Sequence, residues 1–338
     1  MPRPVQGVHG QAGKESVLRG RMKLGSLRID NPFVQAPMAG ITDSAFRTVA
    51  RKFHGGLLYT EMISAEGLCR GNWKTMKYTE MPKDHKPVAL QLVGNDPGRM
   101  AVAAVLAESL GADIIDINAG CPQSRITGPG SGGALLRTPE KIAETVKLAK
   151  KEVSVPVSVK MRLGYSTDES LRIAGLVQDA GADFITVHGR TVSMGFSGES
   201  DSQAIRQVVE ALDIPVLANG DARNEALAVS LLKETGAEGV MLGRATRGRP
   251  DLPGTAYSLL STGTFGRMSP GTLFDTMLEH TELEQELFGG SSGIKRMRKH
   301  VTWYLRAAGL RFDTREVYSL EDAGTLRKLL EKAIFAKA

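Results

Sequence analysis

The sequence predicts an α/β fold: a (β/α)8 TIM barrel followed by a small all-helical C-terminal domain. Three observations support this. Eight short apolar segments with buried-strand character recur between residues 31 and 244, seven helical stretches alternate with them, and purely helical periodicity follows from residue 272. Strands that alternate with helices form parallel sheets, and eight such units in about 215 residues match this barrel in count and size.

The predicted strands span residues 33–38, 56–62, 88–94, 113–120, 157–162, 183–189, 216–220 and 239–244. Local signals mark several of the helices between them. Asp96-Pro97 begins one helix that Gly111 ends, and Gly181 and Gly236 end two others. These boundaries separate the strands into regular βα units.

A doubly wound open sheet is the rival architecture, because the segment from Gly128 to Gly133 fits the pattern G-x-G-x-x-G. A dinucleotide-binding fingerprint must follow a strand directly. Here the nearest strand ends near Gly120 and Pro129 lies inside the turn. We therefore interpret this segment as a flexible lid loop over an active site.

The net charge of +6 is concentrated in two places along the 338 residues. Residues 1–28 hold six basic residues and one acid, and residues 295–315 hold seven basic residues and one acid, with Trp303 and Tyr304 among them. We divide the chain into a basic, disordered extension (1–21), a barrel domain (22–260) and a helical domain (261–338). In the last domain, a predicted helix over residues 294–308 places Ile294, Met297, Val301, Leu305 and Ala308 on one apolar face. Its basic face is either solvated or a surface for nucleic-acid phosphates.

Several classes of protein are disfavoured by composition. No apolar run approaches the roughly 20 residues of a membrane helix, and the N-terminus lacks the apolar core of a signal peptide. Two cysteines, Cys69 and Cys121, give neither a disulfide framework nor zinc-ligand spacing. We expect a cytoplasmic protein without a membrane segment, a bound metal or an implied protein partner, most simply a monomer.

Function in this barrel lies at the carboxyl ends of the strands. The polar residues predicted there are Glu61, Gln91, Asn118 with Cys121, Lys160 with Arg162, His188 with Arg190, Asn219 with Asp221, and Arg244. Buried polar groups require partners, so their convergence at one mouth indicates a binding site.

Two strand ends predict a phosphate site. Asn219-Gly220-Asp221 and Gly243-Arg244 place glycines, backbone N–H groups and a guanidinium after the last two strands, where this barrel usually binds phosphate. Lys160 and His188 suit the ring end of a flavin, because a fixed cation stabilises the negative charge that reduction places on its pyrimidine side.

A family resemblance becomes specific at this point. The segments APMAGITDSAFR (36–47), YTEM (59–62), LQLVGNDP (90–97), DINAGCP (116–122), KMRLG (160–164), HGRT (188–191), ANGD (218–221) and GRATRGRP (243–250) occur in this order. Together they resemble a tRNA-dihydrouridine synthase from about residue 22 to residue 250, with a fainter likeness at residues 297–309.

The resemblance implies an FMN-dependent enzyme that reduces the uracil C5=C6 bond of tRNA and takes electrons from NADPH. The residues that would line FMN are Pro37, Met38, Gln91, Lys160, His188, Asn219, Gly220, Asp221, Gly243 and Arg244. Asn118 would hydrogen-bond the uracil. Candidate tRNA contacts are Arg125, Arg162 and Arg190 at the mouth and Lys295, Arg298 and Lys299 on the basic helix.

Cys121 would be the general acid in this reaction. Hydride from reduced FMN attacks C6 on one face of the uracil, and a proton must reach C5 from the other side. A cysteine side chain has an ordinary pKa of about 8.5, so it is mostly a thiol near neutral pH and can donate this proton. A uracil in folded tRNA reaches such a site only when it is flipped out, which requires a wide cleft and a basic flanking surface.

The sequence departs from the family pattern beside this cysteine. Relatives usually show C-P-x-x-K-V, whereas this chain has Arg125 in place of the lysine, followed by a loop richer in glycine. An aromatic residue that is common near Ser202 is also missing. These changes affect the substrate contacts, and thereby which uridine is reduced, and leave the flavin contacts intact.

Three alternatives stay open at this stage. The barrel could reduce a free pyrimidine, which would leave the basic helix without a reason. It could use the same flavin site for another RNA modification, such as folate-dependent methylation. It could also be a non-catalytic RNA-binding flavoprotein, in which Cys121→Ala would change nothing measurable.

Overall fold

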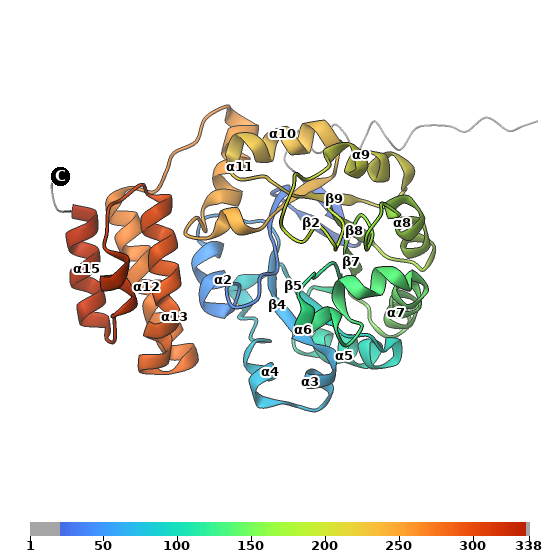
Figure 1. Cartoon of the computed structure of the whole chain (residues 1–338), viewed down its shortest axis with the longest axis horizontal. Helices are drawn as coiled ribbons and strands as arrows, with labels where there is room; N and C mark the ends of the chain where they lie inside the picture. Colours follow the sequence, from blue (N-terminus) through green and yellow to red (C-terminus); the bar gives the residue numbers. More distant parts are fainter. Residues whose placement is uncertain (1–20, 336–338) are drawn as a thin grey trace, which may run out of the picture.

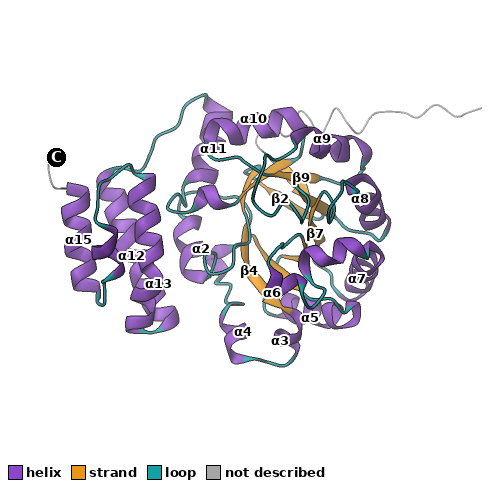
Figure 2. Cartoon of the chain, in the orientation of Figure 1, coloured by secondary structure: helices purple, strands orange, loops and turns teal. Residues whose placement is uncertain are grey.

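The computed structural model describes residues 21–335 and contains the expected barrel, with helices around a ring of parallel strands (Figure 1 and Figure 2). The strands are β3 (Phe33–Gln35), β4 (Leu58–Ser64), β5 (Val88–Val93), β6 (Ile114–Ala119), β7 (Val157–Arg162), β8 (Phe184–His188), β9 (Val216–Asn219) and β10 (Gly239–Leu242). They pair in the order β3-β10-β9-β8-β7-β6-β5-β4. The backbone N–H of Gln35 donates to the Leu57 carbonyl at 3.2 Å and closes the ring. The predicted fold class is confirmed; the predicted extension lies outside the described residues, apart from Arg21.

Helices connect the strands and follow the predicted boundaries. They are α2 (Ser44–Arg51), α3 (Ala65–Cys69), α4 (Trp73–Lys77), α5 (Pro97–Ser109), α6 (Ser124–Thr127), α7 (Pro139–Glu152), α8 (Ser170–Asp179), α9 (Ser202–Ala211), α10 (Glu225–Thr235) and α11 (Leu252–Thr262), with 3-10 turns η1 (Lys83–His85), η2 (Gly132–Arg137) and η3 (Arg244–Thr246). The Asp96 side chain accepts the N–H of Arg99 and caps α5, as its Asp-Pro signal predicts. Gly236 ends α10 with φ of 66°.

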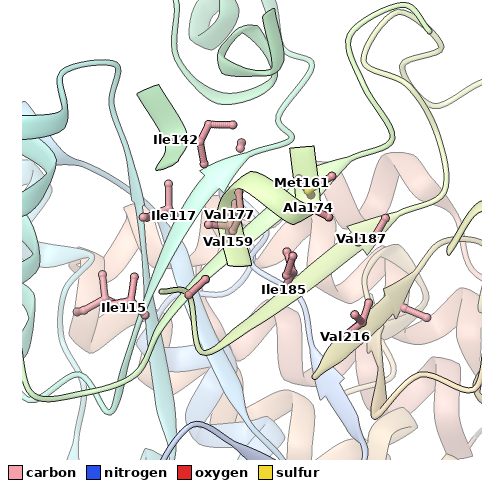
Figure 3. Packing of buried hydrophobic residues seen from close by; sticks show 14 of the residues in the cluster. Ile115, Ile117, Ile142, Val159, Met161, Ala174, Val177, Ile185, Val187 and Val216 are labelled. Atoms are coloured by element: carbon pink, nitrogen blue, oxygen red, sulfur yellow. The ribbon is translucent and has the colours of Figure 1, made fainter. Parts of the chain in front are cut away.

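The main core lies between the outer surface of the strands and the helices. Ile115, Val159 and Ile185 project from three adjacent strands, and Ile142 of α7 and Val177 of α8 belong to the same cluster (Figure 3). All five are fully buried, and such burial stabilises the fold by about 1.5–3 kcal/mol per side chain. This packing fixes the strands whose carboxyl ends position the site.

An antiparallel hairpin, β1 (Met22–Leu24) paired with β2 (Leu27–Ile29), precedes the barrel and was not predicted. Its buried side chains Met22, Leu24 and Ile29 pack with Phe184 and Leu217. These two residues lie at the start of β8 and β9, so the hairpin covers the amino-terminal end of the barrel. The predicted functional residues lie at the opposite end.

The C-terminal residues form a separate group of helices beside α2 (Figure 1). They are α12 (Pro270–Phe288), α13 (Gly290–Ala307), α14 (Thr314–Tyr318) and α15 (Ala323–Phe335). The predicted apolar face of α13 is buried at Ile294, Met297, Val301 and Leu305, whereas Ala308 lies beyond the helix and is exposed. The preceding helix, α11, ends two residues past the boundary expected at 260.

Within residues 21–335, none of the helices combines the length and the apolar character needed to cross a membrane.

Candidate active site

A cavity of about 690 Å³ opens at the carboxyl ends of the barrel strands. Its lining includes all ten residues expected to contact a flavin: Pro37, Met38, Gln91, Lys160, His188, Asn219, Gly220, Asp221, Gly243 and Arg244. Asn118, Cys121, Arg125, Arg162 and Arg190 also line it. The structure thus brings fifteen of the predicted residues into the lining of one cavity, whereas Glu61 and the three candidates on α13 lie outside it.

Asn118, at the end of β6, holds the turn that presents Cys121. Its Oδ1 accepts the backbone N–H groups of Gly120 at 3.2 Å and Cys121 at 3.0 Å, and its Nδ2 donates to Gln91 Oε1 at 2.8 Å. Asn118 is buried, and Cys121 is partly exposed to the cavity. In the structure, the side chain that was expected to contact the substrate base thus fixes the backbone of the cysteine.

The second half of the glycine-rich segment 128–133 packs against the turn that carries Cys121. Gly133 donates its N–H to the Cys121 carbonyl at 2.9 Å, and both Gly132 and Gly133 are buried. A Cβ at Gly133 would lie 2.7 Å from Val192 and 2.9 Å from the Cys121 carbonyl oxygen. The expectation of a flexible lid is therefore wrong for these two glycines, because a close approach to the Cys121 backbone accounts for them.

A small polar network joins three strand ends. Asn219 Oδ1 accepts from Lys160 Nζ at 2.9 Å and lies 2.9 Å from His188 Nδ1, while Asn219 Nδ2 donates to the Met241 carbonyl at 2.7 Å. Burial, and then the nearby Arg162 guanidinium, lower the pKa of Lys160 to about 8. The ammonium thus lacks a full counter-charge, which an anionic ligand in the cavity would supply.

Arg190 connects this network to the loops after β8 and β9. Its guanidinium donates to His188 Nε2 at 3.2 Å and to Asp221 Oδ2 at 2.7 Å. Because Nε2 of His188 accepts this bond, Nδ1 carries the proton and donates to Asn219. Burial and the cations Lys160 and Arg162 hold the pKa of His188 well below its usual range, so the imidazole is neutral.

The backbone at residues 220 and 221 has unusual geometry. Gly220 has φ of 142°, and a Cβ there would lie 1.9 Å from Ser200 Oγ, so only glycine fits. Asp221 has φ of 44°, which is uncommon for a residue with a side chain, and its carboxylate is held by Arg190 and by the N–H of Ser200 at 2.9 Å. Such a constrained turn allows a ligand to approach the backbone closely.

Below the cavity floor, Gln91 donates to Asp116 Oδ2 at 2.7 Å, and Ser158 donates to Asp116 Oδ1 at 2.6 Å. All three side chains are buried. Burial raises the pKa of Asp116 to about 6 although both hydrogen bonds oppose the rise. Gln91 thus has a clear structural role in orienting Asn118, in addition to its place in the cavity lining.

The cavity is strongly cationic. Its lining contains Lys160 and the six arginines Arg125, Arg162, Arg190, Arg223, Arg244 and Arg247, against the single carboxylate Asp221. Sequence reasoning missed Arg223, Arg247 and Phe196. The Arg244 guanidinium lies 4.8 Å from the centre of the Phe196 ring, which is about half exposed at the rim. Arg223 and Arg247 each follow a predicted strand end by a few residues, so a wider search around those ends would have found them.

Glu61 does not line the cavity, contrary to its expected place among the strand ends. The pairing of β4 with β5 changes register between Tyr59 and Met62, and this bulge turns Glu61 away while Met62 lines the cavity. Glu61 Oε2 accepts the N–H of Gly40 at 2.5 Å. The glutamate is buried beside the helical domain, and this burial raises its pKa to about 7.

The three basic residues of α13 have different surroundings. Lys295 is exposed. Arg298 is partly buried and donates to the Leu320 carbonyl, with Nε at 2.9 Å. Lys299 is partly buried and donates to the Gly40 carbonyl of the barrel. These three residues therefore do not form a single basic surface on the helix.

The residues present fit a flavin mononucleotide. The Lys160 ammonium calls for an anionic partner, Gly220 leaves room where a side chain would clash, and the Ser200 hydroxyl beside it is buried without a hydrogen-bond partner. Arg244, after β10, is exposed at the position where this fold binds phosphate. The cavity volume of about 690 Å³ also lies within the usual range for cofactor sites.

A cationic cavity at the carboxyl ends of a (β/α)8 barrel defines the class of protein as a barrel enzyme that binds an anionic cofactor or substrate. Comparison with solved structures agrees on the fold: histamine dehydrogenase from Rhizobium sp. 4-9 superimposes with a TM-score of 0.57 at 13% identity, over 80% of this chain and 51% of that one.

Sequence comparison gives the particular family. Residues 34–337 match the dihydrouridine synthase family, to which the chain belongs. It is 36% identical over 318 residues to a probable tRNA-dihydrouridine synthase of Rhodobacter capsulatus, covering 90% of this chain and 95% of the relative. It is 35% identical over 290 residues to tRNA-dihydrouridine synthase B of Xanthomonas axonopodis pv. citri, covering 84% and 87%. The resemblance seen in the motifs is confirmed.

Proposed function

We propose that the protein reduces the C5=C6 bond of specific uridines in tRNA to dihydrouridine, with FMN as its cofactor and NADPH as the electron donor. The observation that carries the proposal is the convergence, in one cationic cavity, of Cys121, the Lys160–Asn219–His188 network and Arg244. These groups supply an acid, a cation for a reduced ring and a phosphate contact. When bound, FMN supplies the hydride that is transferred to C6 of the uracil.

The flavin would be held by its two ends. Lys160 offers its ammonium to the pyrimidine side of the ring, where reduction adds negative charge. Arg244 and the backbone of Gly220 and Gly243 would bind the phosphate, because they follow the last two strands. Asn219 keeps the lysine in place through its Oδ1.

Cys121 would donate a proton to C5 of the uracil from the face opposite the hydride. Its partial exposure to the cavity allows a base to reach the sulfur, and the bonds from Asn118 and Gly133 hold its backbone. General acids act only within hydrogen-bond reach of the accepting atom, so this fixed backbone is part of the acid's function.

The substrate would be a flipped-out uridine of tRNA. The exposed side chains of Arg125 and Arg223 at the cavity and the exposed Lys295 on α13 can bind phosphates on either side of the base. A tRNA substrate and the names of the relatives support action in the cytoplasm. We propose a monomer, with a helical domain that contributes to tRNA binding.

The test is nucleoside mass spectrometry on unmodified tRNA incubated with the protein, FMN and NADPH, beside Cys121→Ala. We expect dihydrouridine from the wild type and a loss of at least a hundredfold in the variant, the typical range for a general acid. Flavin and tRNA binding without dihydrouridine in the wild type would reject the reaction. Equal activity in Cys121→Ala would reject the acid.

A further inference from the structure

The helical domain contacts the barrel at the loop that lines the cavity. This loop, residues 36–43, follows β3 and carries Pro37 and Met38 into the cavity lining. At its centre, Gly40 has φ of 73°. Its N–H donates to Glu61 Oε2 at 2.5 Å, and its carbonyl accepts from Lys299 Nζ of α13. The barrel thus holds one side of this residue and the helical domain holds the other.

A second cation of α13 holds the end of the same loop. Arg296 Nη2 donates to Asp43 Oδ2 at 2.7 Å, and Arg296 Nε donates to Glu284 Oε2 at 2.9 Å. Asp43 is fully buried and also caps α2 through the N–H of Phe46 at 3.0 Å. The Arg296 guanidinium lies 3.9 Å from Glu61 Oε1. The buried carboxylates of Asp43 and of Glu61, which accepts the N–H of Gly40, therefore both depend on positive charge from α13.

Apolar packing follows the same path. Met38 and Trp303 both pack against the buried cluster that contains Ile41 and Phe46. Trp303 is one helical turn beyond Lys299, and Arg296 is one turn before it. Arg296, Lys299 and Trp303 thus form one side of α13 that faces the loop 36–43, whereas Lys295 is exposed.

We propose that Lys299 is a positioning residue for the flavin site, which acts by holding the Met38–Gly40 turn through the Gly40 carbonyl, and is not a contact to RNA. The inference rests on the proposed function for the identity of the cofactor. A charge-assisted hydrogen bond is stronger than a neutral one. This one ties the helical domain to a turn whose other hydrogen bonds, from the N–H groups of Ile41 and Thr42 to the Met38 carbonyl and from the N–H of Gly40 to Glu61, all lie within the barrel. Without it, the turn should sample other positions and the flavin should bind less tightly.

The experiment compares three variants in the absence of tRNA. Lys299→Met removes the donor and keeps most of the apolar stem, Lys299→Gln keeps an N–H donor on a shorter side chain, and Lys328→Met removes an exposed lysine of α15 as the matched control. The FMN dissociation constant is measured by flavin fluorescence. Amide hydrogen exchange is measured on the flavin-free protein at Gly40, Ile41 and Thr42, whose N–H groups are hydrogen-bonded.

We expect Lys299→Met to weaken FMN binding about tenfold and to accelerate exchange at these three amides, Lys299→Gln to show smaller effects, and Lys328→Met to match the wild type. If Lys299→Met does not fold, Lys299→Gln decides on the same readouts. Unchanged FMN affinity and unchanged exchange rates in Lys299→Met would overturn the proposal. A tRNA affinity lowered about tenfold, from a separate binding measurement on the same variant, would then make Lys299 an RNA contact. A wild type that binds no FMN would reject the proposed function, while the exchange rates would still decide whether Lys299 restrains the turn.

Discussion

Asn118 Oδ1 accepts the backbone N–H of Cys121 at 3.0 Å, so the residue at the end of β6 sets the position of the proposed acid three residues later. The same oxygen accepts the N–H of Gly120. Replacement of this side chain would remove the acceptor of both N–H groups, and the loss of such a hydrogen bond costs about 0.5–1.5 kcal/mol. The turn would respond by moving, and the cysteine would move with it.

We therefore expect Asn118→Ala to bind FMN within about threefold of the wild type and to lose at least tenfold in the rate of dihydrouridine formation, because the acid is misplaced. Asn118→Asp keeps an acceptor for both N–H groups and should retain more of the Cys121 geometry. Single-turnover kinetics on tRNA with pre-reduced enzyme would measure both variants. Equal rates for Asn118→Ala and the wild type would show that this turn does not position the acid.

Lys160 should set the reduction potential of the bound flavin. Its ammonium lies in the cavity with its pKa lowered to about 8 by burial, so an anionic reduced ring would be a favourable partner. Lys160→Met should weaken binding of reduced FMN more than that of oxidised FMN. Each additional tenfold loss of affinity for reduced FMN, relative to oxidised FMN, lowers the two-electron reduction potential of the bound flavin by about 30 mV. A redox titration measures this shift, with the exposed Lys233→Met as the control; identical potentials in all three proteins would contradict the assignment.

Arg125 should act through its charge, because it is exposed on the short helix α6 at the cavity rim. Arg125→Lys restores the lysine of the family pattern and keeps the positive charge, so we expect kcat/KM for tRNA to stay within about threefold. Arg125→Ala should lower it about tenfold, mainly through KM. If kcat/KM of Arg125→Lys instead falls as far as that of Arg125→Ala, the reaction requires bidentate contacts of the guanidinium, and positive charge alone is insufficient.

The barrel and most of its site could be predicted because their signals are local. Strand ends in a parallel barrel meet at one mouth whatever the details of packing, so residues such as Lys160 and Asn219 come together once the strands are identified. Helix caps such as Asp96 depend only on neighbouring residues. The strands β1 and β2 were missed because each is a three-residue segment with a charged residue at its centre, MKL and LRI, which shows neither a period nor an apolar run.

The remaining differences depend on tertiary contacts. A bulge in β4 reverses the direction of Glu61, and nothing in the run of strand residues marks it. The amphipathic pattern of α13 identified its buried face correctly. The directions of Lys299 and Arg298, however, are set by partners outside this helix, Gly40 of the barrel and Leu320 after α14. The sequence therefore predicted one basic surface, whereas in the structure Lys295 is exposed and Arg298 and Lys299 hydrogen-bond backbone carbonyls.

Lys295 is the α13 lysine that we expect to contact tRNA, since it is exposed. Lys295→Met should weaken tRNA binding at low salt and reduce the slope of log K against log salt by about 1, the change expected for one lost phosphate contact. The FMN affinity of Lys295→Met is measured as a control for folding, and it should match that of the wild type. Filter binding over a range of KCl concentrations would measure the slope, and an unchanged slope would place the tRNA elsewhere on the molecule.

Stability at acid pH should depend on the buried histidines between the two domains. His300 is fully buried, lies 4.0 Å from Glu284 Oε1 through its Nε2, and stacks edge-on against His280, with ring centroids 4.6 Å apart. Burial, and then His280, Lys299, Arg296 and Arg247, lower the pKa of His300 well below its usual range. The folded protein therefore keeps it neutral, whereas the unfolded chain binds a proton below pH 6.5.

The free energy of unfolding should therefore fall as the pH drops below 6.5, with a contribution from His300 of about 1.4 kcal/mol per pH unit. His300→Phe keeps an aromatic ring beside Phe46 and Trp303 and removes the titrating group, so its stability should fall less steeply over the same range. Urea unfolding at pH 7.5, 6.5, 5.5 and 5.0 compares the two slopes. Parallel curves would mean that His300 stays unprotonated in the unfolded chain or takes a proton in the folded one, contrary to the expected burial of a neutral imidazole at the junction of α12, α13 and α2.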